Sequence, residues 1–233
     1  MNRRSFLLTL GAIGSAVAPR PSRAASLADW FEDFRVARRF VDAGIPIHSY
    51  VTKSTSMLPT MAIDDVVLAD LRSRGAPPAR GELIVFRNSD GADWMKRAVG
   101  LPGDRIAFKN WRLILNGAEV ACDSAGQGEF ATPTGRRTLP LWRESPPDAR
   151  PYQIVIEDDL PKSWRRLADL PEIEVPPGRV YVLGDNRTNS ADSRTSMIGT
   201  IAISDIVGRV VYRLRPNAGW MVPEQSVPGL PPK

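Results

Sequence analysis

The chain has 233 residues, of which 42% are hydrophobic and 24% are charged, a balance that is ordinary for a globular protein and excludes an intrinsically disordered chain. Its single cysteine, Cys122, excludes an intrachain disulfide and any zinc site built from several cysteines, and its single histidine, His48, has no recognisable catalytic signature around it. The net charge is +5, but the basic residues are scattered, so no nucleic-acid partner is expected, whereas attraction to anionic lipid stays open.

Residues 1–25 have the three parts of an export signal. Arg3-Arg4 precedes a mostly apolar run from Phe6 to Ala18, and a small-x-small site, Ser22-Arg23-Ala24, follows. The arginine pair also resembles the start of a twin-arginine signal. The apolar run is shorter than the ~20 residues that comfortably span a bilayer. Residues 1–25 are therefore predicted to be a cleaved export signal or a retained membrane anchor, and the remainder is predicted to be exported.

Residues 26–48 are predicted to form a helical linker. Trp30, Phe31, Phe34 and Val41 recur at helical spacing and give the segment an apolar face. Because this helix directly follows the export segment, we expect it to lie against the membrane or against the protein body.

After Gly44 the pattern changes to short runs rich in strand-forming residues, with glycine or proline near most of them. The runs are 66–69, 83–86, 105–108, 180–183 and 207–212. Strands and helices do not alternate here, which favours a mainly β fold with antiparallel coiled sheets or a barrel. Residues 49–111 and 178–215 are predicted to form the β core.

Residues 112–177 are less regular and are predicted to form a small inserted lobe. Within them, 113–120 is typical of a hairpin with a turn at Asn116-Gly117. A stretch rich in Pro, Arg and Ser follows from 133 to 151. The Pro- and Gly-rich residues 216–233 are predicted to be a flexible tail.

Four segments carry residues suited to chemistry. Residues 54–61 form a polar loop with a proline turn, and 80–86 is a turn that enters a strand. Residues 94–104 place Lys96 in a β-like run that ends in Leu-Pro-Gly-Asp, and 184–194 is a dense polar loop after a strongly apolar strand. The spacing of the last loop does not match a calcium-binding EF-hand, and two arginines interrupt it.

Lys96 can act as a base only if it is buried. Desolvation disfavours the charged form of a lysine and lowers its pKa from about 10.4. A neutral amine beside a serine is a usable general base, and Ser-Lys pairs recur on unrelated folds. Because the chain has one histidine, this is the natural way for it to activate a serine.

These four segments resemble the signature boxes of the bacterial type I signal peptidase (leader peptidase) family, in the family's order. Ser56-Met57-Leu58-Pro59-Thr60 is similar to the nucleophile box, 96–104 to the lysine box, and 184–194 to the final box nearly throughout. Residues 80–86 are a weaker match. The resemblance runs from about Ser49 to Tyr212 and implies the family's mainly β fold of antiparallel coiled sheets.

The resemblance implies a serine endopeptidase that removes signal peptides from exported preproteins after small-x-small sites. Its implied partners are preprotein signal peptides and the lipid of the cytoplasmic membrane, and it implies no cofactor and no metal. The implied place of the catalytic domain is the outer face of that membrane, or the periplasm if residues 1–25 are removed.

The resemblance also implies a role for particular residues. Ser56 is the implied nucleophile and Lys96 the implied general base. The hydroxyl of Ser54 and the backbone N–H of Ser56 are the implied oxyanion donors, and Ser190 is implied to orient the lysine. The supporting polar positions are Arg97, Asp185, Asp192 and Arg194. The positions that match the substrate pocket are Tyr50, Thr52, Met61, Val67, Trp94 and Met95.

The chain also departs from the family pattern. Thr188 stands where many members carry aspartate, and Thr52-Lys53 replaces the usual aliphatic residue and proline. The short chain is also similar to conjugation-associated pilin-processing peptidases. A non-catalytic periplasmic peptide-binding β-domain is disfavoured by the complete set of implied catalytic residues. A LexA-like autoprotease is disfavoured because an export signal stands where a DNA-binding segment is needed.

Overall fold

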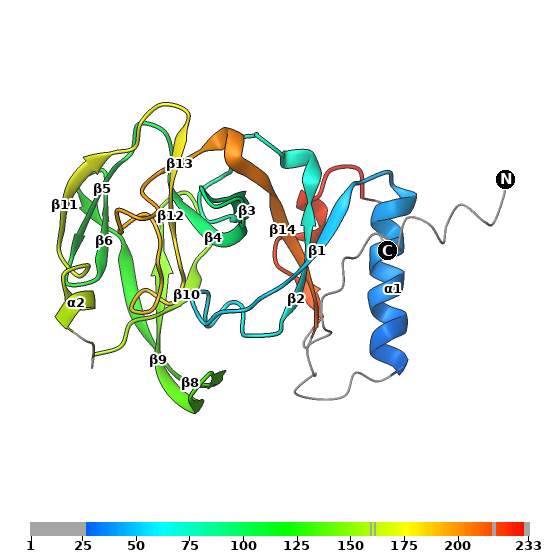
Figure 1. The fold of residues 1–233 in the computed structure, drawn as a ribbon, viewed down its shortest axis with the longest axis horizontal. Coiled ribbons are helices and arrows are strands. Elements are labelled where there is room, and N and C mark those ends of the chain that lie inside the picture. Colours follow the sequence, from blue (N-terminus) through cyan, green and yellow to red (C-terminus); the bar gives the residue numbers. More distant parts are fainter. Residues whose placement is uncertain (1–26, 159, 161, 216–217, 231–233) are drawn as a thin grey trace, which may run out of the picture.

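The computed structural model describes residues 27–158, 160, 162–215 and 218–230 (Figure 1). The predicted export segment, 1–25, lies outside the described residues. Strands dominate the described part, so the predicted mainly β fold class is confirmed. No helix within the described ranges has the length and apolar character needed to cross a membrane.

Eight antiparallel strands form the main sheet, in the order β1-β2-β14-β3-β4-β12-β13, with β15 beside β14. They are β1 (Ile47–Val51), β2 (Val66–Asp70), β3 (Leu83–Arg87), β4 (Asp93–Gly100), β12 (Arg179–Leu183), β13 (Ile201–Ala202), β14 (Ile206–Arg215) and β15 (Gly219–Trp220). Four of the five predicted strand runs fall on β2, β3, β12 and β14, the fifth, 105–108, falls on β5 (Arg105–Lys109) of a smaller sheet, and all five are confirmed. Nearly every residue of β3 and β12 is buried, because both faces of these strands are covered, and this explains their continuous apolar sequence.

Two smaller sheets lie at the end of the molecule opposite the N-terminal helix (Figure 1). One is β11-β5-β6-β7 and the other is β10-β9-β8. The strands are β5 (Arg105–Lys109), β6 (Arg112–Leu115), β7 (Ala118–Glu119), β8 (Ala121–Thr132), β9 (Gly135–Ser145), β10 (Tyr152–Val155) and β11 (Leu170–Glu174), and a short helix, α2 (Lys162–Arg165), precedes β11. β5, from the range predicted for the core, pairs with β6 and β11, from the range predicted for the inserted lobe.

The predicted Asn-Gly hairpin is confirmed. Leu115 pairs with Ala118, and the two turn residues have positive φ angles of 53° at Asn116 and 83° at Gly117. Two consecutive left-handed residues match the twist of the flanking strands, so this local sequence determines the connection between β6 and β7.

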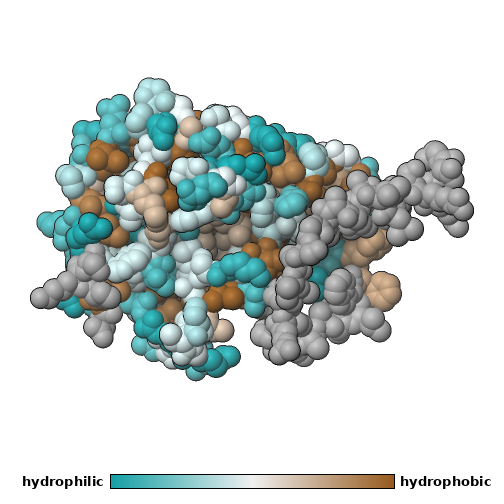
Figure 2. All heavy atoms as spheres, viewed as in Figure 1, coloured by the Kyte–Doolittle hydropathy of each residue, from teal (hydrophilic) through white to brown (hydrophobic). Residues whose placement is uncertain are grey.

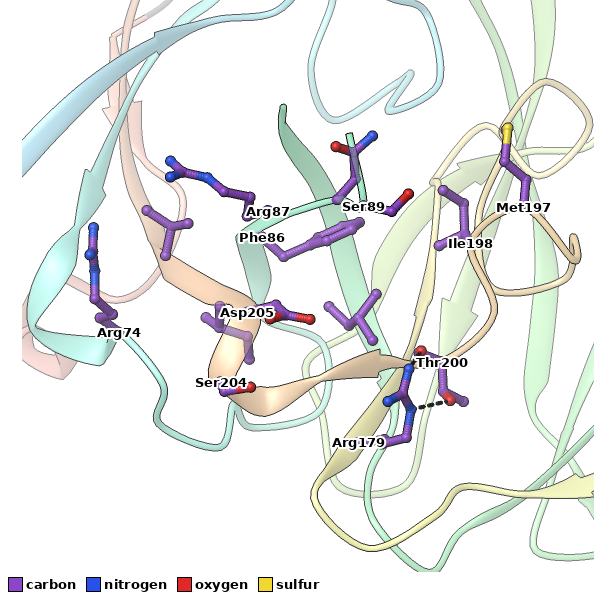
Figure 3. A pocket seen from close by; sticks show the side chains of 14 residues that line it. Arg74, Phe86, Arg87, Ser89, Arg179, Met197, Ile198, Thr200, Ser204 and Asp205 are labelled. Atoms are coloured by element: carbon purple, nitrogen blue, oxygen red, sulfur yellow. Dashed lines mark hydrogen bonds between the residues drawn. The ribbon is translucent and has the colours of Figure 1, made fainter. Parts of the chain in front are cut away.

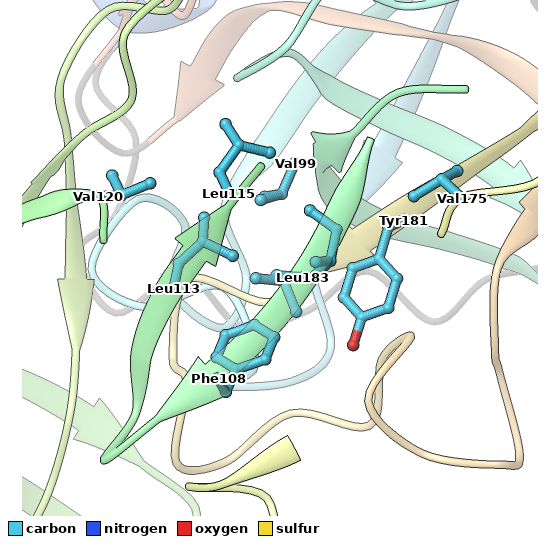
Figure 4. Close-up of a cluster of buried hydrophobic side chains, with 9 residues drawn as sticks. Val99, Phe108, Leu113, Leu115, Val120, Val175, Tyr181 and Leu183 are labelled. Atoms are coloured by element: carbon cyan, nitrogen blue, oxygen red, sulfur yellow. The ribbon is translucent and has the colours of Figure 1, made fainter. Parts of the chain in front are cut away.

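A core cluster joins the main sheet to the four-stranded sheet (Figure 4). Its members are Val99, Ile106, Phe108, Leu113, Leu115, Val120, Val175, Tyr181 and Leu183. Burying a side chain of this kind stabilises the fold by about 1.5–3 kcal/mol. The cluster includes residues of β4 and β12, and it therefore fixes the two strands from which the candidate catalytic segments extend.

The predicted N-terminal helix is confirmed as α1 (Leu27–Asp42), but it is shorter than the predicted range 26–48, because β1 begins at Ile47. Its inner face places Val36 and Phe40 on the β2–β14 side of the main sheet. The helix ends where Gly44 takes a left-handed φ of 67° and its N–H donates to the carbonyl of Val41 at 3.0 Å, a conformation that glycine adopts without strain.

The sequence predicts a flexible tail from residue 216, and residues 218–230 pack against the body. Trp220 contacts Tyr212 edge to face, with ring centroids 5.0 Å apart, and Val227 is buried in the cluster under α1. The Pro- and Gly-rich composition explains the turns in this segment, whereas its few apolar side chains determine its contacts.

Candidate active site

The loop that carries Ser56 connects β1 to β2. Its two ends are joined because Thr52 N–H donates to Asp65 O and Asp64 N–H donates to Thr52 O, both at 2.9 Å. Inside the loop, Leu58 is fully buried against the β9 and β10 side chains. The loop is therefore closed at its base and anchored by an apolar side chain two residues from Ser56.

Lys96 lies on β4 and its ammonium group donates to Ser56 Oγ at 2.8 Å. The lysine is only 4% exposed, and its nitrogen lies against Ser56 of the nucleophile loop and 5.6 Å from the Trp94 ring centroid. Burial lowers its pKa to about 8, against the opposing effect of the Asp192 and Asp185 carboxylates. A lysine with this pKa is partly neutral near neutral pH and can accept the proton of a neighbouring hydroxyl.

Ser54 lies beside the nucleophile. Its Oγ is 3.0 Å from Ser56 Oγ, and it accepts the backbone N–H of Ser56 at 3.4 Å. A hydrogen bond of that length is weak, so a developing oxyanion can replace Ser54 Oγ as the acceptor of the Ser56 N–H. Both donors expected for an oxyanion hole thus lie within the turn that carries Ser56.

Ser190 is buried and lies against Gly184. Its hydroxyl donates to the Ala191 carbonyl at 3.4 Å, and the expected hydrogen bond to Lys96 is not formed between these two described residues. A Cβ placed on Gly184 would lie 2.2 Å from Ser190 Oγ and 2.5 Å from the Ser56 carbonyl oxygen. Gly184 is therefore the point where β12, the final loop and the nucleophile loop meet.

A buried ion pair links β4 to the final loop. Arg97 donates to both carboxylate oxygens of Asp185, at 2.7 and 2.5 Å, and also to the carbonyl of Gly81 at 2.7 Å. Thr60 donates to the same carboxylate from the nucleophile loop. Burial alone would lower the pKa of Arg97, but the Asp185 charge outweighs burial and raises it. The arginine thus remains a cation that joins three segments.

Asp192 and Arg194 form a second ion pair within the final loop. Arg194 donates to the two carboxylate oxygens at 2.9 and 2.7 Å, and Gly184 N–H donates to the same group at 3.0 Å. Burial by itself would raise the pKa of Asp192. The charge of Arg194 and these hydrogen bonds outweigh this effect, so the pKa of Asp192 is lowered. The carboxylate stays ionised and favours the protonated form of Lys96.

Two asparagines of the final loop hold the nucleophile loop, although their roles were not predicted. Asn186 donates its backbone N–H to Ser56 O at 3.0 Å and its side-chain amide to Thr55 O at 3.2 Å. Asn189 donates its amide to Thr55 Oγ1 at 2.9 Å. Their place inside the quoted final box is the signal that could have identified them.

Glu144, a residue of β9 that supports the site from the hairpin of β8 and β9, was not predicted. It accepts two hydrogen bonds from Arg187, both at 2.5 Å, and one from the Tyr152 hydroxyl at 2.7 Å. Glu144 and Arg187 are buried, and Tyr152 is half-buried. Burial by itself would raise the pKa of Glu144. The charge of Arg187 outweighs this effect, so the pKa of Glu144 is lowered. Arg187 directly follows Asn186, so this pair fixes the part of the loop that holds Ser56.

Replacing Glu144 by Gln is expected to destabilise the fold by about 3 kcal/mol, because it leaves the buried Arg187 without a counter-charge. Urea unfolding at neutral pH measures the effect. The matched control is Glu129→Gln on the same hairpin, because its ion pair with Arg136 is exposed and is expected to contribute less than about 1 kcal/mol. Equal stability of both variants would contradict the structural role of Glu144.

Four of the six predicted pocket residues lie together beside the nucleophile loop. Tyr50, Met61, Val67 and Met95 pack in one cluster that also contains Met57. Because Met57 directly follows Ser56 in the sequence, this cluster brings apolar side chains to the nucleophile.

The other two predicted pocket residues lie outside this cluster. Thr52 is buried and its hydroxyl donates to the Ala62 carbonyl, so it closes the base of the loop. Trp94 packs with a different cluster, and its ring centroid is 5.6 Å from the Lys96 nitrogen. Successive residues on a strand face opposite sides, which explains why Trp94 and Met95 separate.

A hollow of about 450 Å³ lies between β3, the start of β14 and the loop before β13 (Figure 3). Phe86, Ile198 and Arg179 are among its lining residues, and Ser56 and Lys96 are not. The guanidinium of Arg179 is already held by Thr200, to whose hydroxyl it donates at 2.8 Å. This hollow is therefore separate from the Ser56–Lys96 pair.

Several known proteins are similar to this chain in sequence. The family model described as "Signal peptidase, peptidase S26" matches residues 36–215. The chain is 34% identical over 170 residues to signal peptidase I of Bacillus caldolyticus, and the match covers 72% of this chain and 79% of that protein. It is 29% identical over 212 residues to signal peptidase I of Pseudomonas fluorescens, covering 79% of this chain and 69% of that protein. It is 28% identical over 199 residues to signal peptidase IB of Staphylococcus aureus, and the match covers 82% of this chain and 90% of that protein.

A solved structure of a signal peptidase I from Enterococcus faecalis V583 is 21% identical, with a TM-score of 0.33, and covers 57% of this chain and 95% of that chain. The family assignment depends on the sequence comparisons, since the family model spans most of the chain and the Bacillus caldolyticus relative is matched over more than two thirds of both proteins. The chain therefore belongs to the signal peptidase family, peptidase S26.

Proposed function

We propose that this protein is a signal peptidase I, a serine endopeptidase that removes signal peptides from exported preproteins, with Ser56 as nucleophile and Lys96 as general base. The observation that carries the proposal is the 2.8 Å hydrogen bond between Lys96 and Ser56, at a position where burial lowers the pKa of the lysine to about 8. The names of the relatives favour this function over a non-catalytic peptide-binding domain or a pilin-processing peptidase.

In the proposed reaction, Ser56 Oγ attacks the scissile carbonyl carbon while its proton passes to the neutral Lys96 amine. The hydroxyl of Ser54 and the N–H of Ser56 donate to the oxyanion, and such a donor lowers the barrier by roughly 3–4 kcal/mol. The Lys96 ammonium then protonates the leaving amine. The nearby Asp192 and Asp185 carboxylates favour that ammonium. A water activated by the regenerated amine hydrolyses the acyl-enzyme.

The pH dependence of cleavage should follow Lys96. Because the base acts only when neutral and burial lowers its pKa to about 8, kcat/KM is expected to rise with pH to a plateau above pH 8 and to fall about tenfold per unit below it. A pH series with a preprotein peptide measures this. His48→Ala should leave the acidic limb unchanged, whereas a limb that disappears in this variant would point to a histidine mechanism.

A peptide series that varies only the residue before the cut tests the proposed substrate class. The cluster of Tyr50, Met61, Val67 and Met95 is closely packed, and forcing extra bulk into such a site costs about 1–3 kcal/mol. Alanine or serine at this position should therefore be cleaved at least about tenfold faster than leucine or phenylalanine. Equal rates for alanine and phenylalanine would exclude specificity for small-x-small sites.

The proposed location is the outer face of the cytoplasmic membrane. Support comes from the sequence, in which Arg3-Arg4 and the apolar run from Phe6 to Ala18 precede the described part. Retained, this segment would attach the catalytic domain to the bilayer, and cleaved after Ala24 it would release the domain to the periplasm. Lipid and signal peptides are accordingly the proposed partners.

A further inference from the structure

Arg213, near the end of β14, connects the main sheet to the nucleophile loop. Hydrophilic residues are spread over the surface in Figure 2, but the side chain of Arg213 is only 20% exposed. Its Nη2 donates to the carbonyl of Thr60, and its Nε forms an ion pair at 3.5 Å with Oδ2 of Asp65, the last residue of the loop. One side chain of the sheet therefore contacts the loop at two points, and it lies outside the four segments in which site residues were predicted.

Thr60 is held through both of its polar groups. Its hydroxyl donates to Asp185 and accepts from Arg97 at 3.2 Å, and these two residues form the buried ion pair beside the catalytic pair. Its carbonyl accepts from Arg213. A hydrogen bond from a charged donor is about twice as strong as one between neutral groups. The position of Thr60 therefore depends on Arg213 as well as on the buried ion pair.

The segment from Thr55 to Met61 is a compact turn. Leu58 N–H donates to the carbonyl of Thr55 at 3.1 Å, and Met61 N–H donates to the carbonyl of Met57 at 2.9 Å. The first hydrogen bond encloses Ser56, and the second encloses the threonine that β14 holds. Because the two bonds overlap along the chain, a displacement of that threonine is passed to the nucleophile.

The second contact of Arg213 involves a buried charge. Asp65 is 2% exposed, and its carboxylate accepts the N–H of Ala62 at 3.0 Å. Burial raises the pKa of Asp65, and the Ala62 hydrogen bond and the Arg213 charge only partly oppose this effect. Removing the arginine would leave the carboxylate buried without its counter-charge, which is costly. The end of the loop therefore also depends on Arg213.

We propose that Arg213 is a positioning residue, which holds the nucleophile loop so that Ser56 Oγ stays within hydrogen-bonding distance of Lys96. The C-terminal segment takes part, because the sulfur of Met221 lies 3.7 Å from the nitrogen that binds the loop. This inference rests on the proposed function, since it concerns the same reaction. Arg213 acts through the loop and not on the substrate.

Arg213→Met in the full chain tests the inference, and Arg209→Met is its matched control. Both arginines lie on β14, and each binds one carbonyl and one carboxylate. Arg209 donates to the carbonyl of Pro77 at 2.9 Å and pairs with Glu82 at 3.1 Å, outside the nucleophile loop. Both variants should lose stability in urea. Only Arg213→Met should lower kcat for a preprotein peptide per folded molecule, by at least about tenfold and with little change in KM.

The pH profile gives a measurement that a loss of stability alone would not move. The pKa of Lys96 is lowered by burial, and its nitrogen lies against the nucleophile loop. If the loop shifts, water reaches the amine and its pKa rises toward the ordinary value. Because the amine acts only when neutral, the acidic limb of kcat/KM should move to higher pH in Arg213→Met and stay in place in Arg209→Met. The charged groups that face the amine are the same in both variants: Asp185, Asp192 and Arg194.

Arg213→Lys gives a conservative comparison. A lysine keeps the cation but can donate to only one of the two partners at a time, since it lacks the fork of the guanidinium. It should recover part of kcat and part of the shift of the acidic limb. The same comparison with Arg209→Met applies to this variant if Arg213→Met does not fold.

Hydrogen exchange of residues 54–62, followed by mass spectrometry, tests the loop without requiring catalysis. Faster exchange of this segment is expected in Arg213→Met than in Arg209→Met. Equal exchange in the two variants, or equal kcat and an equal acidic limb, would overturn the inference. A full chain that cleaves no preprotein peptide but shows the expected difference in exchange would contradict the proposed function, while it would still support the role of Arg213 in holding the loop.

Discussion

Replacing Lys96 by Met is expected to reduce kcat/KM for a preprotein peptide by at least about 10⁴-fold, and Ser56→Ala is expected to have a similar effect. Lys96→Arg should fail as well, because a guanidinium stays protonated and cannot accept the Ser56 proton. The folded fraction should not fall, since Met fills the buried volume of Lys96 without a charge to desolvate. Peptide cleavage and urea unfolding measure the two effects separately.

The matched control for this prediction is Lys53→Met. Lys53 lies three residues before Ser56, but its side chain is exposed. Its Nζ forms a surface ion pair with Asp64 Oδ1 at 3.6 Å. It should keep near-normal activity. Because Ser56 and Lys96 act as one unit, the double variant Ser56→Ala/Lys96→Met should be no slower than either single variant. Substantial activity in Lys96→Met would exclude the lysine as the base.

The strands and the N-terminal helix could be predicted because their signals are local. Runs such as 83–86 and 180–183 are apolar and β-branched over the length of a strand, and the spacing of Phe34 and Val41 is helical. Their pairing could not be predicted in the same way. The neighbours of β14 are β2, β3 and β15, a choice that depends on contacts far apart in the sequence.

The catalytic pair was predicted from a resemblance, and the structure adds the distance and burial that the chemistry needs. Ser56 and Lys96 are 40 residues apart and meet because the nucleophile loop folds against β4. Nothing in the local sequence determines whether Lys96 points inward. Its 4% exposure depends on segments far apart in the sequence, such as the nucleophile loop that lies against it, and this burial lowers its pKa.

The supporting residues that were missed depend on contacts between distant segments. Glu144 lies 43 residues from its partner Arg187, within a range whose sequence is irregular. A lone glutamate in such a range is ordinarily exposed, so only the fold reveals that it is buried. Thr60 is similar, because its bond to Asp185 joins residues 125 positions apart.

The geometry of a strand places two of the predicted pocket residues in different packing clusters. Trp94 and Met95 match neighbouring positions in the resemblance, but adjacent strand residues point to opposite faces. In the structure Met95 packs near the nucleophile loop with Met61, and Trp94 packs with Phe86 on the other face. The contribution of Trp94 is thus to the surroundings of Lys96.

Replacing Gly184 by Ala is expected to lower kcat by about 10²-fold while the protein remains folded, although Gly184 is not a member of the catalytic pair. The added Cβ would lie 2.2 Å from Ser190 Oγ, 2.4 Å from Ser190 Cβ and 2.5 Å from the carbonyl oxygen of Ser56. A Cβ atom essentially never lies within 3.0 Å of a non-bonded heavy atom, so the final loop and the nucleophile loop must move apart. A displacement of about 1 Å at the reacting atoms is enough for a large rate loss.

The matched control for Gly184→Ala is Gly100→Ala, which introduces a Cβ 2.8 Å from Tyr181 Cβ and 3.0 Å from Ile106 and Val175 in the core. Both variants should unfold at lower urea concentration, because both crowd closely packed regions. Only Gly184→Ala should lose kcat when each protein is assayed where unfolding measurements show it to be native. If the two variants keep the same kcat per folded molecule, the contact between Gly184, Ser190 and the Ser56 carbonyl does not position the nucleophile.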